Sequence, residues 1–383
     1  MWKRVLWITV LSLVVLVVLL AVSGPLLALL GVQPPFSIES SSGGLRLVRA
    51  TVDPASLPAL APGTAAALAR DAKPAIVDTD MAADDWLAIL YLLQHPRVDV
   101  QAITVVGTGE AHCGPGVQNA LDLVALAGRP EIPIACGRET PLSGDHTFPR
   151  TWRARVDNLL GLSLPSNPNP PYAGFAVELL TRTILRSPQP VHLVALGPLT
   201  NIAQALEASP ELVDNLGVIT IMGGAVNVPG NVGASSDTGN DWAEWNIYAD
   251  PHAAGVVLRS GAPVTLVPLD ATQDVPVTSG FQKALRRERD TPAAEFAYRV
   301  LAQKAADIQS GGYYFWDPFA AAAATDGTLA AFQEMFLIVV EEEGPQSGRT
   351  LVSSAGYPIP VATRADAARF ERLFLETLNS QSP

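Results

Sequence analysis

From Pro74 onward, short apolar runs rich in β-branched residues alternate with amphipathic stretches of helical periodicity. Near-continuous apolar strands separated by helices are typical of a mostly parallel sheet with helices on both faces. We therefore expect an open, doubly wound α/β domain, in which ligands bind beyond the carboxyl ends of the strands. The pattern predicts strands at Ala75–Asp80, Val100–Val106, Ile132–Cys136, His192–Gly197, Val218–Met222 and Val264–Asp270. It predicts helices at Asp85–Gln94, Val117–Ala127, Ala173–Arg186, Leu199–Ala208 and Pro251–Arg259.

A long apolar run precedes this domain. Residues 5–32 contain no charged side chain, and this length exceeds the roughly 20 residues that cross a bilayer as a helix. Lys3 and Arg4 stand just before the run, which predicts a cytoplasmic N-terminus and an extracytoplasmic domain. We therefore expect an N-terminal transmembrane helix that anchors the protein in the cell membrane as a single pass. A signal peptide cleaved near Ala21-Val22-Ser23 is the alternative, and it would make the protein secreted.

The organisation that follows has four parts. Residues 1–4 form a cytoplasmic stub and residues 5–32 the anchor or signal sequence. Residues 33–72 contain Pro34-Pro35, a Ser/Gly cluster and a Pro/Ala-rich segment, so we interpret them as a spacer. The catalytic domain is expected at residues 73–383.

Composition excludes some classes of protein. The 383 residues include 37 acidic and 25 basic side chains, a formal net charge of −12, which argues against a nucleic-acid partner. The two cysteines, Cys113 and Cys136, are too few for a Cys-rich zinc module. They fit either a disulfide in an oxidising compartment or two buried thiols. The sequence does not determine the oligomeric state, and a homo-oligomer is one of the possibilities.

Four carboxylates lie at the end of the first predicted strand. Asp78, Asp80, Asp84 and Asp85 occur within eight residues, and no lysine or arginine precedes Arg97 in this segment. Such a cluster is electrostatically unfavourable unless a cation is present. Capping of the next helix explains one or two of these acids but not all four. The segment therefore predicts a site for a hard divalent cation such as calcium, which prefers oxygen ligands.

Other strand ends carry candidate ligands. The turn at Gly197-Pro198 leaves the carbonyl of Leu196 free to face the site. Met222 ends the next strand before two glycines, which allow a ligand to approach the backbone closely. A polar loop then supplies amide and carboxylate groups suited to binding sugar hydroxyls: Asn231, Asn240, Glu244 and Asn246. Asp317 lies in an apolar stretch, where an unpaired charge is costly, so it needs a partner.

Taken together, the motifs resemble those of the inosine-uridine-preferring nucleoside hydrolase family. Asp78-Thr-Asp80-x-x-x-Asp84-Asp85 is similar to the N-terminal signature of that family. The resemblance extends over roughly residues 73–383, through Asn119-Ala-Leu, Gly197-Pro-Leu-Thr-Asn201, Met222-Gly-Gly224, Gly230-Asn231, Glu244-Trp-Asn246 and Asp250-Pro-x-Ala-Ala254. It implies an open α/β domain that binds one Ca²⁺ and cleaves the N-glycosidic bond of ribosides.

The resemblance also implies roles for individual residues. Asp80, Asp85 and Asp317 match the carboxylate ligands of calcium, and the Leu196 carbonyl matches its backbone ligand. Asp80 also matches the general base that activates water. The residues that match the ribose-binding set are Asp84, Asn231, Glu244 and Asn246.

Two departures from the family pattern affect the leaving group. Trp316 occupies the position before Asp317 where the family usually has a histidine that helps the base depart. Tryptophan cannot supply a titrating proton, although it can stack on a base, and simple core packing is the alternative. The second strand usually ends in Gly-Asn, whereas this chain has Gly107-Thr-Gly-Glu110-Ala-His112. We expect Glu110 to accept a sugar hydroxyl, and His112 is a candidate for the missing acid. Asn240 competes with Asn231 for the ribose.

The leading hypothesis is a calcium-dependent hydrolase of ribonucleosides or a related riboside. A non-catalytic, tethered nucleoside- or sugar-binding domain with the same metal site is the main alternative. Asp78-x-Asp80 also resembles the nucleophile pair of haloacid-dehalogenase-type phosphatases. The lysine and the later acidic pair of that family have no counterparts at the Leu196 and Met222 strand ends.

Overall fold

The computed structural model describes residues 36–41, 44–49, 72–236 and 238–380. The predicted membrane segment, residues 5–32, lies outside the described residues. None of the described helices is long and apolar enough to cross a bilayer. The chain divides into two compact units, residues 1–58 and 59–383, which are treated separately below.

The first unit contains a small hairpin within the predicted spacer. Strands β1 (Phe36–Ser41) and β2 (Gly44–Arg49) pair in antiparallel register. Apolar and polar residues alternate along both strand sequences, a pattern typical of paired strands.

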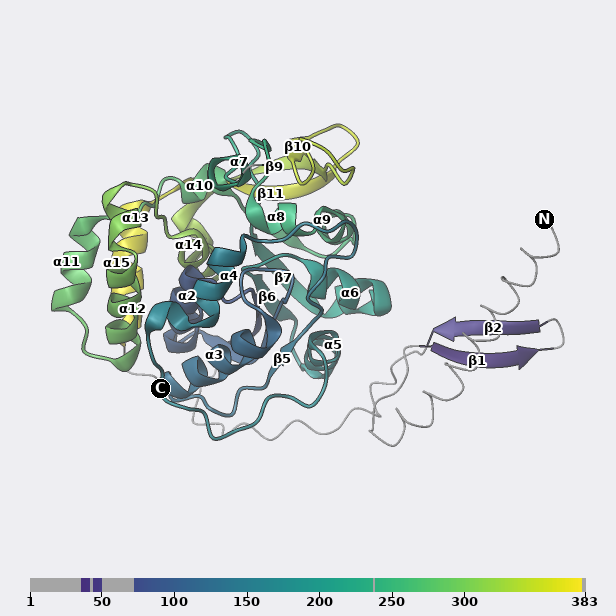
Figure 1. The fold of residues 1–383 in the computed structure, drawn as a ribbon, viewed down its shortest axis with the longest axis horizontal. Helices are drawn as coiled ribbons and strands as arrows, with labels where there is room; N and C mark the ends of the chain where they lie inside the picture. Colours follow the sequence, from purple (N-terminus) through teal and green to yellow (C-terminus); the bar gives the residue numbers. More distant parts are fainter. Residues whose placement is uncertain (1–35, 42–43, 50–71, 237, 381–383) are drawn as a thin grey trace. The chain divides into compact units, whose positions relative to one another are not determined.

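The second unit is built on a nine-stranded sheet in the order β10-β9-β11-β8-β7-β6-β3-β4-β5 (Figure 1). Seven of its strands form a parallel array, which confirms the predicted architecture. These strands are β3 (Lys73–Thr79), β4 (Val98–Val105), β5 (Ile134–Cys136), β6 (Val191–Ala195), β7 (Leu216–Met222), β8 (Val264–Val267) and β11 (Tyr357–Ala365). Strands β9 (Ala330–Val339) and β10 (Thr350–Val352) extend the sheet in antiparallel fashion.

Up to Asp270, the predicted strands and helices differ from the observed ones mainly at their ends, whereas β9, β10 and β11 lie in a part of the chain for which no element was predicted. The strand predicted to run to Asp270 stops at Val267, because Pro268 follows and cannot donate a hydrogen bond to a neighbouring strand. Residues Leu269–Thr272 form the short helix α10 instead.

Helices cover both faces of the sheet. One face packs against α5 (Ala176–Arg186), α6 (Thr200–Ala208) and α9 (Pro251–Leu258). The other packs against a larger group, and Figure 1 shows its outer helices together on the side away from α6. This group comprises α2 (Ala83–Gln94), α3 (Cys113–Leu126), α11 (Ser279–Arg287), α12 (Pro292–Gln303), α14 (Trp316–Thr325) and α15 (Ala367–Leu378). Shorter helices line the loops: α4 (Arg150–Asp157), α7 (Val232–Ser235), α8 (Trp245–Ala249) and α13 (Ala305–Gln309).

Helix α2 forms the centre of the core. Every residue from Asp85 to Gln94 is buried, and Trp86 and Tyr91 are among the largest side chains with almost no exposure. Full burial of one large apolar side chain stabilises the fold by about 1.5–3 kcal/mol. The helix that carries two of the predicted site acids is thus held rigidly on all sides.

The order of the strands places a crevice beside β3. The chain runs outward from β3 to β4 and β5, and then returns to β6 on the opposite side of β3. Such a reversal leaves a gap at the carboxyl ends of the two adjacent strands, where ligands bind in open α/β sheets. The acids after β3 and the Leu196 turn after β6 both lie at this position.

A disulfide answers the question that the cysteines left open. Cys113, at the start of α3, is bonded to Cys136 at the end of β5, with their Cα atoms 5.6 Å apart. A cross-link over 23 residues stabilises a fold by roughly 3 kcal/mol in the chain-entropy model.

Candidate active site

A strained turn positions the acids after β3. Met81 has φ of 59°, in the left-handed region, and a non-glycine residue in such a conformation costs of order 1–3 kcal/mol. The Thr79 hydroxyl stabilises the turn: it accepts a hydrogen bond from the Met81 amide at 2.9 Å and donates one to the Asp85 carboxylate. The turn therefore directs Asp80 and Asp85 into the crevice.

Three carboxylates meet above this turn. Asp84 and Asp85 from α2 and Asp317 from the first turn of α14 each offer an oxygen, and the three oxygens lie within 4.8 Å of one another. Burial, together with the neighbouring carboxylates, raises the pKa of Asp85 and of Asp317 well above the usual range. Among the described residues, Asp85 Oδ2 and Asp317 Oδ1 have no hydrogen-bond partner. Orphaned carboxylate oxygens in this arrangement fit a bound divalent cation, which would satisfy both.

Asp80 borders this cluster. Its carboxylate accepts hydrogen bonds from the backbone amides of Glu110 at 2.9 Å and Ala82 at 3.3 Å. Burial raises its pKa to about 6, with a further contribution from the charge of Asp84. The structure thus groups the predicted ligands Asp85 and Asp317 with Asp84, while the third predicted ligand, Asp80, lines the same cavity beside them.

The glycine at position 109 makes the contact with Asp80 feasible. A Cβ atom at Gly109 would lie 2.1 Å from the Cβ of Asp80, so a larger residue would displace the loop or the acid. Because this loop approaches so closely, the Glu110 amide reaches the Asp80 carboxylate. Glu110 itself lines the cavity, and burial and the charge of Asp80 raise its pKa to about 8.

These acids form the floor of a cavity of about 420 Å³. Leu196, Met222, Asn231, Glu244 and Asn246 line it as well, as predicted from the strand ends. The carbonyls of Leu196 and Met222 accept hydrogen bonds from the Asn246 side chain, at 2.9 and 3.2 Å. The amide oxygen of Asn231 accepts from the Trp245 backbone at 3.1 Å.

Glu244 is held by backbone amides. It caps α8 by accepting from Asn246 at 2.9 Å and Ile247 at 3.3 Å, and it also accepts from Gly224 at 3.0 Å. Burial nevertheless raises its pKa to about 7. Its orientation is fixed before any ligand arrives, because three donors from two segments hold it.

Two predicted site residues lie outside the cavity. The Asn240 side chain joins its loop to the segment between β9 and β10: its amide nitrogen donates to the Ser347 carbonyl at 2.8 Å, and its oxygen accepts from the backbone amides of Trp242 and Ala243. His112 is 48% exposed and bonds Asp157 at 2.7 Å. The structure therefore assigns neither of them to the cavity wall, in contrast to the expected roles in ribose binding and base protonation.

Trp316 does line the cavity, beside Asp317. Its ring lies 5.4 Å from that of Tyr313, edge to face, and 5.6 Å from that of Tyr314. Tyr313 is only 5% exposed, and its hydroxyl has no hydrogen-bond partner among the described residues. Tyr313 and Trp316 therefore form an aromatic wall of the cavity, and the Tyr313 hydroxyl is a hydrogen-bond donor on this wall that has no partner among the described residues.

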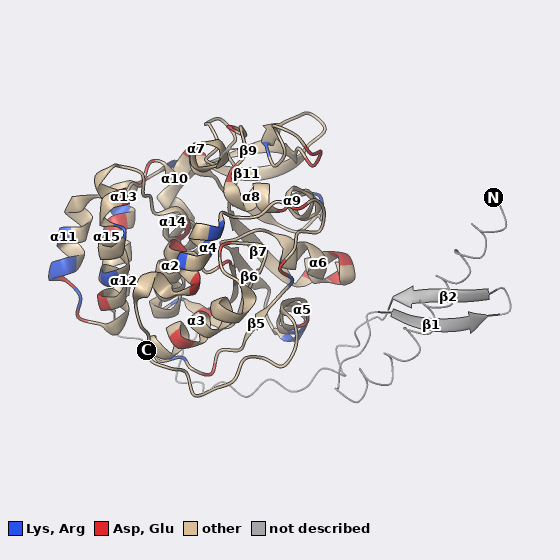
Figure 2. Cartoon of the chain, in the orientation of Figure 1, with Lys and Arg blue, Asp and Glu red and all other residues tan. Residues whose placement is uncertain are grey.

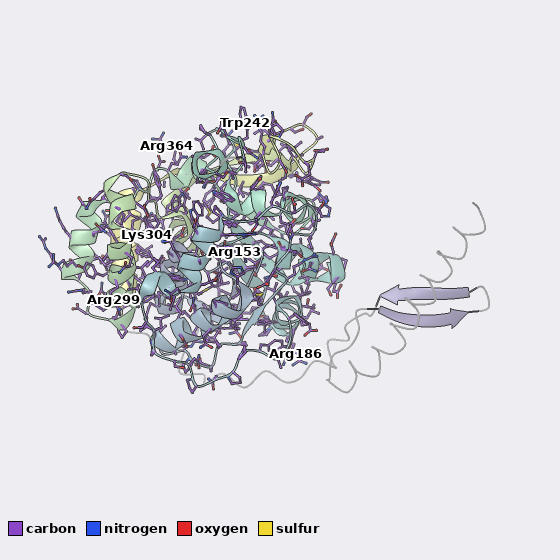
Figure 3. All side chains as sticks on the ribbon, viewed as in Figure 1. Arg153, Arg186, Trp242, Arg299, Lys304 and Arg364 are labelled. Atoms are coloured by element: carbon purple, nitrogen blue, oxygen red, sulfur yellow. A yellow bond between two sulfur atoms is a disulfide. The ribbon has the colours of Figure 1, made fainter. Side chains whose placement is uncertain are left out.

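A second wall of the cavity, formed by α4 and the segment before it, was not predicted from the sequence. Phe148, Trp152 and Arg155 line the cavity there, and Figure 2 shows basic positions on α4 close to acidic positions on α2. Arg153, labelled in Figure 3, is buried and donates to the carbonyls of Gly107 at 2.9 Å and Ala111 at 3.2 Å. It thereby fixes both ends of the Glu110 loop. The aromatic residues after β5, a strand that ends at the same edge, were the available signal.

Asp78 does not reach the cavity. It is fully buried, and one oxygen accepts from the Thr104 hydroxyl at 2.5 Å and the Asn201 amide at 2.8 Å. An aspartyl nucleophile must contact its substrate, so this placement does not support the phosphatase alternative.

Comparisons with known proteins identify the family of this chain. Residues 75–372 match the model of a family described as inosine-uridine preferring nucleoside hydrolase. A pyrimidine-specific ribonucleoside hydrolase of Citrobacter koseri is 38% identical over 207 residues, which cover 52% of this chain and 61% of that protein. The chain thus spans about 61% of the length of the curated relatives it matches.

Solved structures resemble nearly the whole domain. A plant nucleoside hydrolase has a TM-score of 0.72 at 31% identity, covering 81% of this chain and 99% of its own. A purine-preferring ribonucleoside hydrolase from Gardnerella vaginalis has a TM-score of 0.71 with the same identity and coverage. These relatives differ in their named base preference, purine in one and pyrimidine in another.

Proposed function

The chain belongs to the inosine-uridine preferring nucleoside hydrolase family of N-glycosyl hydrolases, and from this premise we propose that it hydrolyses the N-glycosidic bond of ribonucleosides with the help of Ca²⁺. The observation that carries the proposal is the meeting of Asp84, Asp85 and Asp317 beside Asp80 at the crevice of the sheet. Asp80, Asp84 and Asp85 are neighbours in the sequence, whereas Asp317 comes from α14, far along the chain.

The proposed cation ligands are Asp80, Asp85, Asp317 and the Leu196 carbonyl, with Asp84 beside them. All are oxygen donors, which suits calcium better than a transition metal. When bound, the cation supplies positive charge that lowers the pKa of a water molecule and orients ribose hydroxyls.

Asp80 is the proposed general base. Its pKa is about 6 in the metal-free fold, so the carboxylate is ionised at neutral pH even without the cation and can accept a proton from water. Its position is fixed by the Glu110 and Ala82 amides, so the carboxylate is oriented before the substrate binds.

The remaining polar residues bind the sugar. Asn231, Asn246, Glu244 and Asp84 present amide and carboxylate groups that accept or donate to hydroxyls, and Glu110 adds a further acceptor. As the C–N bond breaks, the sugar acquires oxocarbenium character, and these carboxylates stabilise its positive charge. The aromatic wall around Trp316 is proposed to stack on the departing base.

A base-release assay tests this function. The full-length protein is incubated with a panel of purine and pyrimidine nucleosides, with calcium or with a chelator. We expect free base only with calcium, and none from the Asp80→Ala variant. Riboside binding in equilibrium dialysis without base release would instead support a non-catalytic binding domain.

We further propose that the domain acts outside the cytoplasm. The Cys113–Cys136 disulfide supports this location, because such bonds persist mainly in oxidising compartments. The charge pattern around residues 5–32 favours a membrane anchor. Protease treatment of intact cells should remove the domain if it is displayed outside and leave it whole if it is internal.

A further inference from the structure

The cavity has an unusual balance of charge. Acidic side chains dominate its lining, and among the residues that the structure describes only Arg155 and Lys304 contribute positive charge to it. None of the described histidines lines the cavity, and the candidate acid His112 bonds Asp157 outside it. Any group that leaves this cavity as an anion therefore encounters strong repulsion.

Cleavage of a nucleoside creates such a group. The electron pair of the C–N bond moves onto a ring nitrogen of the base, while water supplies the oxygen to the sugar and its proton to Asp80. Carboxylates that stabilise the cationic sugar destabilise the anionic base by the same Coulomb interaction. Trp316, which lines the cavity beside Asp317, offers no titrating proton, so the base needs another source of positive charge.

Lys304 has the appropriate position. It lies at the junction of α12 and α13 (Figure 3), it is half-buried, and its Nζ is 5.3 Å from the centroid of the Tyr313 ring. Tyr313 in turn packs against Trp316, so the ammonium group is on the aromatic wall. No carboxylate lies within 4 Å of it among the described residues.

The charge of Lys304 also reaches the substrate region. Burial raises the pKa of Asp84 and of Glu110, which both line the cavity, and the charge of Lys304 opposes the rise at both, whereas Arg155 opposes it at Glu110 alone of the two. Arg155, by contrast, is solvent-exposed and projects from α4 on the other wall. Lys304 is therefore the better placed of the two cations to contact a base that is stacked on Trp316.

We propose that Lys304 is a catalytic residue that stabilises the departing base, an assignment that rests on the proposed function. Its ammonium group donates a hydrogen bond to a ring nitrogen or carbonyl oxygen of the base as negative charge develops there. No proton needs to be transferred in this step, because the released base takes its proton from solvent. The preferred substrates are therefore nucleosides whose base carries an acceptor within reach of this wall.

Substrates with different leaving groups test the assignment. The full-length protein and its Lys304→Met variant are assayed with inosine, uridine and 4-nitrophenyl riboside. A charge-assisted hydrogen bond to the base is expected to contribute about 10- to 100-fold in kcat. We expect this loss with inosine and uridine and less than roughly a 3-fold loss with 4-nitrophenyl riboside, because nitrophenolate is a stable anion.

Three further variants separate the explanations. Lys304→Arg keeps the charge and should restore most of the activity on inosine. Lys283→Met removes an exposed lysine on α11 and should leave all three rates unchanged. Arg155→Met should reduce inosine cleavage less than Lys304→Met does; a selective loss in Arg155→Met alone would assign the role to Arg155 and overturn the proposal.

The remaining outcomes are equally decisive. An equal loss on all three substrates would show that Lys304 maintains the cavity rather than acting on the base, and no loss would show that it does neither. Wild-type protein that cleaves 4-nitrophenyl riboside but not nucleosides would confirm hydrolysis and contradict assistance by Lys304. Wild-type protein that releases a product from none of the substrates would overturn the proposed function, and this assignment with it.

Discussion

The buried acids should make stability depend on pH and on calcium together. Burial raises the pKa of Asp80 from 3.8 to about 6 in the metal-free fold. A carboxyl whose folded pKa is raised contributes stability that is fully present below the unfolded pKa and is lost as pH rises through the folded value. The metal-free protein should therefore become less stable between pH 4 and pH 7. A bound cation favours the ionised carboxylates and opposes this loss.

The size of the effect follows from the shift. One pKa unit corresponds to about 1.4 kcal/mol, so the ionisation of Asp80 costs the metal-free fold roughly 3 kcal/mol. For a domain of this size, 1 kcal/mol changes Tm by roughly 2 °C, which gives a decrease of about 6 °C. Burial raises the pKa values of Asp85 and Asp317 as well, so their ionisation destabilises the metal-free fold in the same direction.

Thermal unfolding followed by circular dichroism measures the dependence. Tm is recorded from pH 4 to pH 8, once with excess calcium and once with a chelator. We expect the two curves to meet near pH 4 and to separate steadily above it. Coincident curves across the whole range would refute the assignment of the acidic cluster as a metal site.

One variant sharpens the experiment. Asp85→Asn removes a buried charge, so in chelator at pH 8 it should be more stable than the wild type, yet it should gain little from calcium. Glu207→Gln, which alters an exposed acid on α6, should follow the wild-type curves. A variant that is less stable in chelator and responds fully to calcium would contradict the argument.

Three other predictions concern the walls of the cavity. Arg153→Met should lower kcat/KM about 10-fold and Arg153→Lys less, because the Glu110 loop loses two hydrogen bonds to its carbonyls, and the pH profile should change as the loop moves. The Cys113→Ser, Cys136→Ser double variant should lose roughly 3 kcal/mol in urea unfolding, and a reductant should lower the wild type to the same stability without affecting the variant. Trp316→His should raise inosine cleavage relative to 4-nitrophenyl riboside and give it a pH dependence near the histidine pKa of about 6.5.

The strands and helices around the crevice could be predicted because their signal is local. A buried parallel strand such as β6 is a continuous apolar run, and its boundaries follow from the residues within it. Strand β9 differs, because only its second half is a continuous apolar run, Met335–Val339, and its first half contains Gln333 and Glu334. Phe332 and Phe336 are exposed on it, while Met335 is buried, so its pairing with β11 depends on contacts that the local pattern does not contain.

The same distinction applies to the candidate site: residues at strand ends could be predicted, and residues positioned by tertiary packing could not. Asp80, Leu196 and Met222 follow predicted strands, and the topology of a parallel sheet brings all strand ends to one edge. Lys304 and Trp152 lie on helices and connections whose positions over that edge depend on tertiary packing. Asn231 and Asn240 are two asparagines of the same polar segment, so the sequence alone does not tell them apart. In the structure Asn231 lines the cavity, whereas the side chain of Asn240 forms its hydrogen bonds within the protein.

The four acids of the first motif illustrate why a sequence pattern overstates the number of ligands. Asp78 bonds Thr104 of β4 and Asn201 of α6, so it ties the strand to its neighbours beneath the cavity. Burial raises its pKa to about 7, and hydrogen bonds from those two partners oppose the rise. This buried acid, the Met81 turn and the facing carboxylates all destabilise the fold, and the packed core around α2 offsets that loss of stability. A bound cation would remove much of the repulsion between the carboxylates. The dependence of Tm on pH and calcium together therefore measures how much the cation stabilises the fold.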